Sequence, residues 1–431
     1  MSWETVYQAK LTDAATAVSH IQSGQRVYIG GGAGVPRTLT DALGARQDDL
    51  RDVELTHILT FADAPYAKPG REAMFRVNAL FIGANVRQAV NEGRADFTPV
   101  FLSEIPDLFR REILPLDVAL ISLSPPDEHG FCSFGVEVGV TKPAAENARI
   151  IIAEINRQMP RCLGDSFIHV NRLDYVVPVD YPLPLSPQGG SSDVHLQIGQ
   201  HVAEMIPDGA TLQMGIGNIP DAVLKSLTHH KDLGVHTEMF SDGVIDLVDQ
   251  GIISCSRKTF HPGKIVAGFL FGSQRLYDFV HNNPLIEMHP IDYVNDPFNI
   301  ARNNNMVAIN SAMQIDLTGQ VCADSIGSRF YSGVGGQVDF IRGAARSPGG
   351  LPIIACQATA QDGKVSRIVP TLYEGSGVVT SRNDVHYVVT EYGVASLHGR
   401  TIRERVKALI NIAHPQFRDE LRYGAEKLGY L

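Results

Sequence analysis

The sequence predicts an α/β protein built from two similar open-sheet domains. Three observations carry this prediction: short β-rich segments alternate with helical patterns, a proline- and glycine-rich stretch interrupts the chain at residues 181–192, and the segments on either side of it repeat one plan. Strands that alternate with helices form largely parallel sheets. Because 431 residues are long for one domain and suit two of about 200 residues each, we expect domains at 1–185 and 186–431.

The strands are predicted from short runs rich in β-branched and aromatic residues. These runs are residues 26–29, 118–122, 149–153, 175–178, 306–309 and 386–389. Between them, apolar residues recur at helical spacing, as in residues 194–206, where Pro207 stops the pattern. The last long helix starts with the capping-box pair Thr401 and Glu404 and ends before His414-Pro415.

The internal repeat is visible as an ordered set of matches. A strand leads into Gly30–Pro36 in the first half and into Met214–Pro220 in the second, and an amphipathic helix follows each turn. Further on, residues 52–57 match residues 232–236 with one residue fewer, which aligns His57 with His236. Two positions later this alignment sets Leu59 against Glu238, so we expect only the second copy to carry a carboxylate there.

Composition and charge exclude several classes of protein. A formal net charge of −10 argues against a general nucleic-acid binder. No apolar run is long enough to span a membrane, and the first residues lack an export signal, so we expect a cytoplasmic protein. The five cysteines are scattered and never spaced as Cys-x-x-Cys, which argues against a disulfide scaffold and against a zinc ribbon.

Glycine turns offer two places where a ligand could approach the backbone. Gly215-Ile216-Gly217-Asn218-Ile219 joins a strand to a helix with Pro220 expected at the first helical position, and free N–H groups at a helix start favour a negative group. The second place is the loop containing Ser332, Gly335 and Gly336. In each case a tight structural turn is the alternative interpretation. The dinucleotide fingerprint fails, since Pro220 stands where its third glycine belongs.

Glu238 is the strongest catalytic candidate. It lies near the carboxyl end of a predicted strand and just before the turn signal Ser241-Asp242-Gly243. Ligands of open α/β sheets bind beyond the carboxyl ends of the strands. A surface glutamate beside a turn is the alternative. For Asp127, Glu128 and His129 a polar turn is favoured over a metal site, and Cys132 is interpreted as a small buried residue.

The ordered motifs together resemble the acetyl-CoA hydrolase/transferase family, and within it the branch of butyrate and 4-hydroxybutyrate CoA-transferases. The matching stretches are residues 124–130, 213–220, 236–238, 241–243, 307–310, 332–340, 381–386, 389–393 and 413–415. The resemblance implies a duplicated CoA-transferase fold with the active site between its two domains. It also implies that Glu238 attacks an acyl-CoA and forms an acyl-glutamyl anhydride and then a glutamyl-CoA thioester.

The resemblance assigns roles to further residues. Asn310 and Glu391 match active-site side chains, and Ile216 and Gly336 match the oxyanion hole and contacts with CoA. Ser332 and the neighbouring glycines, together with residues 215–219, are expected to line the pantetheine. Leu351 and Cys356-Gln357-Ala358 depart from many relatives, which leaves the partners of the CoA phosphates open. The candidates are Arg342, Arg346, Lys364 and Arg382.

The implied substrates are a short acyl-CoA and a small carboxylate such as acetate. No tightly bound cofactor, metal, nucleic acid or membrane is expected, and a dimer or tetramer is implied. Three alternatives stay open at this point: an acyl-CoA hydrolase that uses the same Glu238, a dinucleotide-dependent oxidoreductase, and a non-catalytic acyl-CoA-binding protein.

Overall fold

The computed structural model describes residues 2–46, 50–187 and 189–431. Its contacts divide the chain into two compact units: the first comprises residues 1–186 and 266–294, and the second comprises residues 187–265 and 295–431. The segment 266–294 therefore groups with the first unit, although the sequence prediction placed it in the second domain. The boundaries 1–185 and 186–431 stay a prediction about domains.

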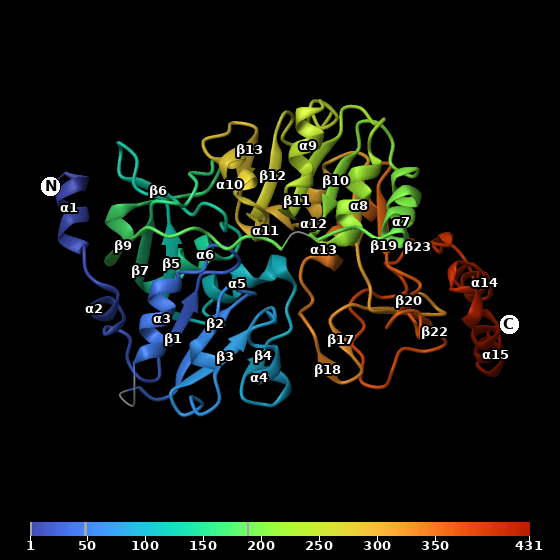
Figure 1. The fold of residues 1–431 in the computed structure, drawn as a ribbon, viewed down its shortest axis with the longest axis horizontal. Helices are drawn as coiled ribbons and strands as arrows, with labels where there is room; N and C mark the ends of the chain where they lie inside the picture. Colours follow the sequence, from blue (N-terminus) through green and yellow to red (C-terminus); the bar gives the residue numbers. More distant parts are fainter. Residues whose placement is uncertain (1, 47–49, 188) are drawn as a thin grey trace. The chain divides into compact units, whose positions relative to one another are not determined.

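The first unit is built on a parallel sheet of seven strands, shown mainly in blue and cyan in Figure 1. In spatial order its strands are β4 (Asp96–Phe97), β3 (Phe75–Ala79), β2 (Val53–His57), β1 (Arg26–Ile29), β5 (Leu116–Leu123), β7 (Ala148–Asn156) and β9 (Tyr175–Val179). Its first six helices are α1 (Trp3–Lys10), α2 (Ala14–Val18), α3 (Arg37–Ala45), α4 (Arg87–Asn91), α5 (Ile105–Arg110) and α6 (Thr141–Asn147). Leu39 and Leu43 of α3 pack in one core with Val27 of β1 and Leu55 of β2, all fully buried.

Smaller elements complete this unit. The strands β6 (Phe131–Ser133) and β8 (Phe167–His169) pair in an antiparallel ribbon. The segment 266–294 holds most of β12 (Ile265–Leu270), and then α10 (Gln274–Val280), β13 (Ile286–Met288) and α11 (Ile291–Val294).

The second unit repeats the arrangement with its own parallel strands. In spatial order these are β11 (Gly234–Phe240), β10 (Thr211–Met214), β14 (Met306–Asn310), β19 (Leu351–Ala355) and β23 (Tyr387–Thr390), and the antiparallel β24 (Gly393–Ser396) follows. The larger helices are α7 (Asp193–Ala203), α8 (Asn218–Ser226), α9 (Gly243–Asp249), α12 (Pro297–Ala301), α13 (Gln337–Arg346), α14 (Ile402–Ile412) and α15 (Arg418–Lys427). Helices connect the parallel strands and help to bury their apolar side chains, in agreement with the α/β fold that the sequence predicts.

Helix ends in this unit follow simple hydrogen-bond rules. The capping box predicted at Thr401 and Glu404 is confirmed, because each side chain bonds the other's backbone N–H. The expectation that Pro220 is the first helical residue is wrong: α8 begins at Asn218, with Gly217 as its N-cap. Pro220 is tolerated as the third helical residue because the first four N–H groups of a helix have no partner within it.

The strand register confirms the duplication and corrects one alignment. Leu55 pairs with Val27, the second residue of β1, and Val235 pairs with Leu212, the second residue of β10. Asp52 and Asp232 precede these strands with φ of 54° and 56°. When Asp52 is aligned with Asp232, Leu55 falls on Val235 and no gap is needed. A shift of one residue would turn every side chain of the strand to the other face of the sheet, so the strand pairs support this alignment.

In the corrected alignment the residue that corresponds to Glu238 is Ile58, not Leu59. Ile58 is fully buried, and a Cβ added to Gly31 would lie 2.5 Å from its Cγ1. In the first copy, an apolar side chain therefore occupies the position that Glu238 has in the second copy. The prediction that only the second copy carries a carboxylate here is confirmed.

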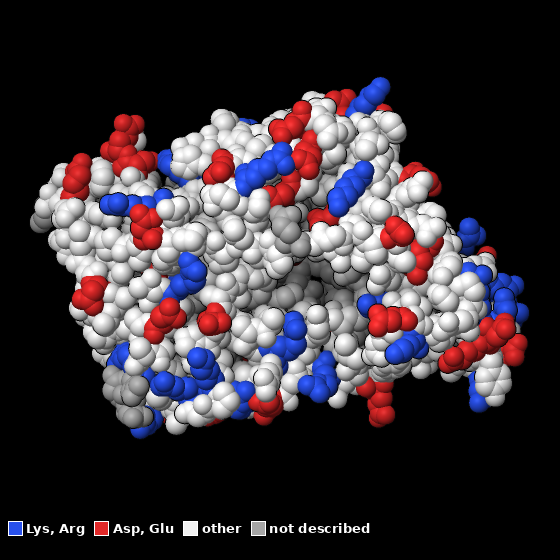
Figure 2. Space-filling model, in the orientation of Figure 1, with Lys and Arg blue, Asp and Glu red and all other residues white. Residues whose placement is uncertain are grey.

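Within the described residues, no helix combines the length and apolar character that crossing a membrane requires. Figure 2 shows acidic and basic side chains interspersed over the face displayed. All five cysteines are buried free thiols, in agreement with the interpretation of Cys132. Burial raises the pKa of Cys132 to about 12, so this thiol stays protonated.

Candidate active site

Glu238 lies on β11, two residues before the strand ends. The neighbouring Thr237 fixes this part of the strand, because its hydroxyl donates to the carbonyl oxygen of Met214 at 3.0 Å. Glu238 is partly buried, and its Oε2 accepts a hydrogen bond from Nδ2 of Asn295 at 3.0 Å. The carboxylate is thus held in one orientation at the carboxyl end of a buried strand.

Gly336 packs directly against this carboxylate. It is the N-cap of α13, and a Cβ added to it would lie 2.0 Å from Oε2 of Glu238 and 2.1 Å from Nδ2 of Asn295. No side chain fits there, so glycine is required by the close approach and not by its backbone angles, which are φ −98° and ψ 8°. The helix start presents its free N–H groups to an anion.

Two opposing effects set the pKa of Glu238. Burial raises it above the ordinary value of 4.5, while hydrogen bonds from the Asn295 side chain and the Gly336 backbone act in the opposite direction. Removal from water weakens solvation of the carboxylate, and the two donors partly replace the lost water. The result is a poorly solvated but oriented carboxylate, which suits a nucleophile.

The glycine turn after β10 is open. A Cβ added to Gly215 or Gly217 would meet no atom within 4 Å, and Gly217 has φ of 120°, a conformation that favours glycine. Ile216 and Ile219 are partly buried, whereas Asn218 is exposed. This strand-to-helix junction therefore leaves room for a ligand to approach the backbone.

Asn310 and Glu391 lie at the carboxyl ends of β14 and β23. The Nδ2 atom of Asn310 donates to Oε1 of Gln213 at 3.0 Å, and Gln213 is on the adjacent strand β10. Glu391 is buried, and its Oε2 accepts from the backbone N–H of Ala358 at 2.8 Å. The sequence departs from many relatives at Cys356-Gln357-Ala358. Because the hydrogen bond to Glu391 comes from the backbone N–H of Ala358, it does not depend on the side chain at that position.

The parallel sheet gathers these groups on one edge. The strands β11, β10, β14, β19 and β23 are consecutive and parallel, so their carboxyl ends point the same way. The edge carries Glu238, the glycine turn, Asn310 and Glu391, and the helix that crosses from β14 to β19 brings Gly336 to Glu238. Ligand sites of open α/β sheets lie at such edges.

Other predicted residues have different neighbours. The hydroxyl of Ser332 donates to the carbonyl oxygen of Gly333 at 3.3 Å, and Gly335 has φ of 62°. Arg342 forms an ion pair with Asp384 at 3.3 Å, and Arg346 donates to the backbone carbonyl of Arg342. The contacts of Arg342 and Arg346 are therefore with residues other than Glu238.

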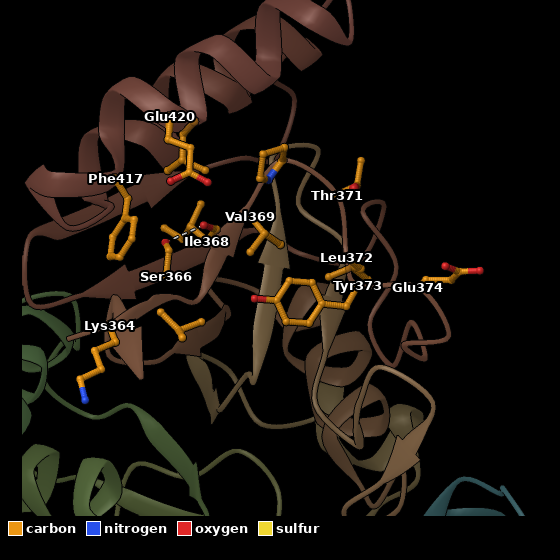
Figure 3. Close-up of a pocket in the computed structure, with 13 residues that line it drawn as sticks. Lys364, Ser366, Ile368, Val369, Thr371, Leu372, Tyr373, Glu374, Phe417 and Glu420 are labelled. Atoms are coloured by element: carbon orange, nitrogen blue, oxygen red, sulfur yellow. Dashed lines mark hydrogen bonds between the residues drawn. The ribbon is translucent and has the colours of Figure 1, made fainter. Parts of the chain in front are cut away.

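The described residues of the second unit also form a cavity of about 580 Å³ (Figure 3). Lys364 lines it together with the acidic Glu374 and Glu420 and the aromatic Phe417 and Tyr373. Neither Glu238, Asn310 nor Glu391 is among its lining residues. The cavity and the candidate active site therefore do not share these residues.

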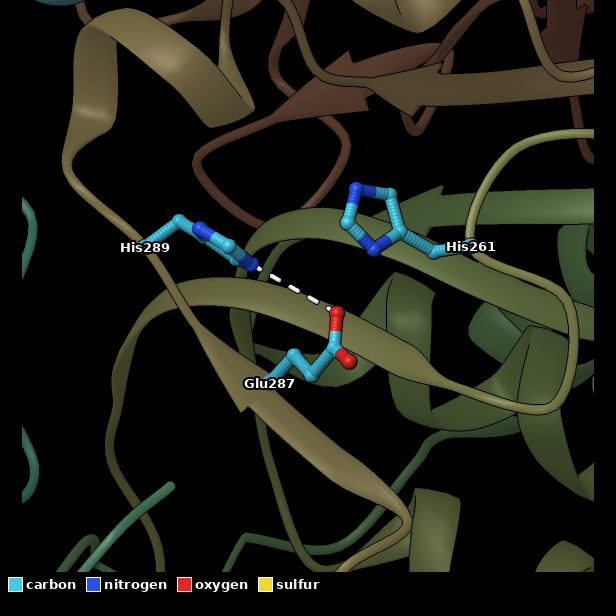
Figure 4. Close-up of side chains that lie close together, drawn as sticks. All are labelled: His261, Glu287 and His289. Carbon is cyan, nitrogen blue, oxygen red and sulfur yellow. Dashed lines mark ion pairs between the residues drawn. The ribbon is translucent and has the colours of Figure 1, made fainter. Parts of the chain in front are cut away.

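Two further polar groups lie in the first unit. Asp127 accepts from the backbone N–H groups of His129 and Phe131, which confirms the predicted polar turn. Nε2 of His289 lies 3.5 Å from Oε2 of Glu287, a contact that is an ion pair when the histidine is protonated (Figure 4).

Asn295 and Gln213 are contacts of the candidate active-site residues that sequence reasoning missed. Asp296 and Pro297 after Asn295 signal the start of α12. No local pattern, however, shows that Asn295 contacts a residue 57 positions earlier in the chain. Gln213 lies inside the quoted motif 213–220, and only the pairing of β10 with β14 brings it to Asn310.

Comparison with known families decides the identity of this fold. The N-terminal domain of the acetyl-CoA hydrolase/transferase family matches residues 1–185, and its C-terminal domain matches residues 272–425. The chain belongs to the acetyl-CoA hydrolase/transferase family. Members of this family are enzymes that act on CoA thioesters, so the chain is an enzyme of this class.

Similar proteins within the family are CoA-transferases. The chain is 54% identical over 421 residues to the 4-hydroxybutyrate coenzyme A transferase of Clostridium kluyveri, and this alignment covers 98% of each chain. It is 50% identical to the succinyl-CoA:acetate/propanoyl-CoA:succinate CoA transferase of Fasciola hepatica, over 94% of this chain and 85% of that protein. The crystal structure of 4-hydroxybutyrate CoA-transferase from Porphyromonas gingivalis matches with a TM-score of 0.86 and 42% identity, over 99% of this chain and 100% of that one.

Proposed function

We propose that the protein transfers CoA between a short acyl-CoA, such as 4-hydroxybutyryl- or butyryl-CoA, and acetate. The observation that carries the proposal is Glu238, which is held at the carboxyl end of β11 by Asn295 and packed against Gly336. The names of the similar CoA-transferases support the class of reaction and the range of acyl groups.

The reaction proceeds by two exchanges at carbonyl carbons. A carboxylate oxygen of Glu238 attacks the thioester carbon of the acyl-CoA, the C–S bond breaks, and CoA leaves as a thiolate. The thiolate then attacks the glutamyl carbon of the anhydride, which releases the first carboxylic acid as its anion and leaves a glutamyl-CoA thioester. Acetate enters by the same two steps in reverse order and leaves as acetyl-CoA.

A carboxylate is a weak nucleophile towards a thioester, so alignment must supply much of the acceleration. Holding both reactants in the reacting geometry contributes about 7 kcal/mol or more. In this proposal the backbone N–H groups of Ile216 and Gly336 stabilise the oxyanion that forms at each step, at about 3 kcal/mol for each donor. The open space above Gly215 and Gly217 is where the pantetheine arm would run.

The remaining candidates take supporting roles. Asn310, already hydrogen-bonded to Gln213, helps to place the acyl intermediate, and Glu391 is the second carboxylate of the site. Asn218, Ile219, Ser332 and Gly335 contact the pantetheine. The proposal requires no tightly bound cofactor and takes the protein to be a dimer or tetramer, which light scattering in solution tests.

Hydrolysis of acyl-CoA by the same Glu238 is the second candidate, because the family includes both activities. The two differ only in whether water or a carboxylate ends the reaction. Turnover with and without acetate separates them: transfer requires acetate and yields acetyl-CoA, whereas equal release of free CoA in both cases rejects transfer.

The substrate is tested by a panel of acyl-CoA donors against acetate and 4-hydroxybutyrate. The proposal expects the highest kcat/KM for butyryl-CoA and 4-hydroxybutyryl-CoA. A clear preference for succinyl-CoA or for a cyclic acyl group would contradict the proposed donor while leaving the glutamyl mechanism intact.

A further inference from the structure

Asn295 makes its side-chain hydrogen bond to the proposed nucleophile. It is fully buried, and its Nδ2 lies 3.0 Å from Oε2 of Glu238. Its other polar atom, Oδ1, is buried and has no hydrogen-bond partner among the described residues. The reverse orientation of the amide would set two acceptor oxygens against each other, so an ionised Glu238 requires the amide N–H to face it.

A rigid support holds the amide in place. Asn295 precedes α12, whose N-cap Asp296 accepts from the backbone N–H of Phe298 at 2.8 Å. The helix α12 packs on α13 so closely that a Cβ added to Gly343 would lie 2.4 Å from Cγ2 of Ile300. Since Gly336 caps the same helix α13, one helix pair carries both donors that face Glu238.

A buried amide with one unpartnered atom contributes little to folding. Leaving a buried acceptor without a partner costs about 1–3 kcal/mol. The side chain of Asn295 donates its hydrogen bond to the carboxylate of Glu238 and does not cap a helix or close a turn. The arrangement therefore points to a role in the reaction.

We propose that Asn295 is a positioning residue that holds Oε2 of Glu238, leaves Oε1 to attack the thioester, and stabilises the oxyanion on Oε2 when the glutamyl carbon is attacked. This inference rests on the proposed function. When the CoA thiolate bonds to the glutamyl carbon, the C=O electron pair moves onto Oε2. It returns when the bond to Oε1 breaks and the acyl carboxylate leaves with that oxygen.

The negative charge on Oε2 is larger in this tetrahedral state than in the anhydride or the thioester. A donor fixed beside Oε2 therefore stabilises the transition state more than the ground state, which is the condition for catalysis. The amide of Asn295 meets this condition without moving, because its N–H already lies at hydrogen-bond distance in the free protein.

The test compares Asn295→Ala and Asn295→Asp with Asn303→Ala as a matched control. Asn303 is also fully buried with an unpartnered Oδ1, but its Nδ2 donates to the backbone carbonyl of Ile300 in its own helix end. Single-turnover loading of CoA onto the enzyme from butyryl-CoA is measured between pH 4 and 8, together with CoA binding by titration calorimetry and thermal melting.

The proposal expects loading to slow about 100-fold in Asn295→Ala, with CoA binding retained, and to stay at the wild-type rate in Asn303→Ala. The acid limb of the pH profile moves to higher pH in Asn295→Ala and further in Asn295→Asp, by about one unit or more, because a second carboxylate disfavours ionisation of Glu238. A purely structural role would change melting and leave the acid limb in place.

The outcomes separate this inference from the function on which it rests. Loading at the wild-type rate and with the wild-type acid limb in folded Asn295→Ala overturns the role of Asn295 only. Failure of the wild-type enzyme to load CoA on Glu238 overturns the proposed function itself. If Asn295→Ala does not fold, Asn295→Asp, which keeps the side-chain volume, decides by the same two measurements.

Discussion

Glu238 must meet two demands that oppose each other. It has to be ionised to attack, yet a carboxylate stripped of water is the better nucleophile, and burial raises the pKa of Glu238 above its ordinary value. The hydrogen bonds from Asn295 and Gly336 offset part of this effect. The sequence could single out Glu238 from its place near a strand end together with the internal repeat and the family resemblance, but not Asn295, because that contact depends on tertiary packing.

This balance predicts the pH dependence of the chemical step. Glu238 reacts as the anion, so the rate of CoA loading should fall as the pH drops through a pKa that lies above 4.5. Single-turnover loading between pH 4 and 8, with circular dichroism at each pH as a control for folding, checks this. An acid limb at or below pH 4.5 in folded protein would contradict the environment described for Glu238.

At the scale of elements, glycines decide which backbone can come close to the carboxylate. Replacing Gly336 with alanine puts a methyl group 2.0 Å from Oε2 of Glu238. The side chain must then move, and a displacement of about 1 Å can lower a rate about 100-fold. We expect Gly336→Ala to lose at least that much kcat and also to melt at a lower temperature, because the methyl group would lie 2.1 Å from Nδ2 of the buried Asn295 although a φ of −98° suits alanine.

The matched control for this change is Gly190→Ala, since a Cβ at residue 190 would meet no atom within 4 Å. Steady-state kinetics of both variants checks the prediction. Wild-type kcat in Gly336→Ala would show that the close packing at this helix start is not needed.

Gly215→Ala tests the glycine turn instead. The added methyl group meets nothing in the free protein, but it would enter the space proposed for pantetheine. The expected result is a KM for acyl-CoA raised about 10-fold or more with an unchanged melting temperature; roughly 1.4 kcal/mol of lost binding gives that factor. An unchanged KM would place CoA elsewhere.

Local patterns predicted the elements well and their details less well. The six expected strands and the capping box at Thr401 are confirmed, because a strand run and a cap are encoded within a few residues. The start of α8 was placed two residues late, since proline is tolerated anywhere in the first turn of a helix. The contact between Asn310 and Gln213 required the order of the strands.

At the scale of the whole molecule, two copies of one fold have diverged in their buried acids. The second copy carries Glu238, whereas Ile58 fills the matching place in the first. The first unit keeps Glu154 fully buried at the end of β7, where it accepts from the backbone N–H of Leu39 at 2.6 Å and from the hydroxyl of Tyr181. The internal repeat was predictable from sequence, but its register required the strand pairs.

Glu154 predicts a pH-dependent stability. Burial raises the pKa of Glu154 to about 7, against hydrogen bonds from Tyr181 and Leu39 that act to lower it. The folded protein then binds this proton more tightly than the unfolded chain. The stabilisation is therefore fully present below about pH 4.5 and is lost as the pH rises through about 7.

Glu154→Gln should remove this dependence, because an amide of the same shape does not ionise. Relative to the wild type, the free energy of unfolding of the variant should rise by about 3 kcal/mol between pH 4.5 and 7 and then level off. Urea unfolding across this range checks it. A difference between the two proteins that stays constant with pH would mean that Glu154 is ionised throughout.

The central claim is that Glu238 carries CoA covalently during turnover, and one measurement tests it most directly. The enzyme is incubated with butyryl-CoA, treated with borohydride, which reduces a glutamyl thioester to an alcohol, and digested for peptide mass mapping. The account predicts reduction at residue 238 alone, and none in Glu238→Ala under the same conditions. Reduction at another residue, or an active enzyme in which residue 238 is never reduced, would contradict it.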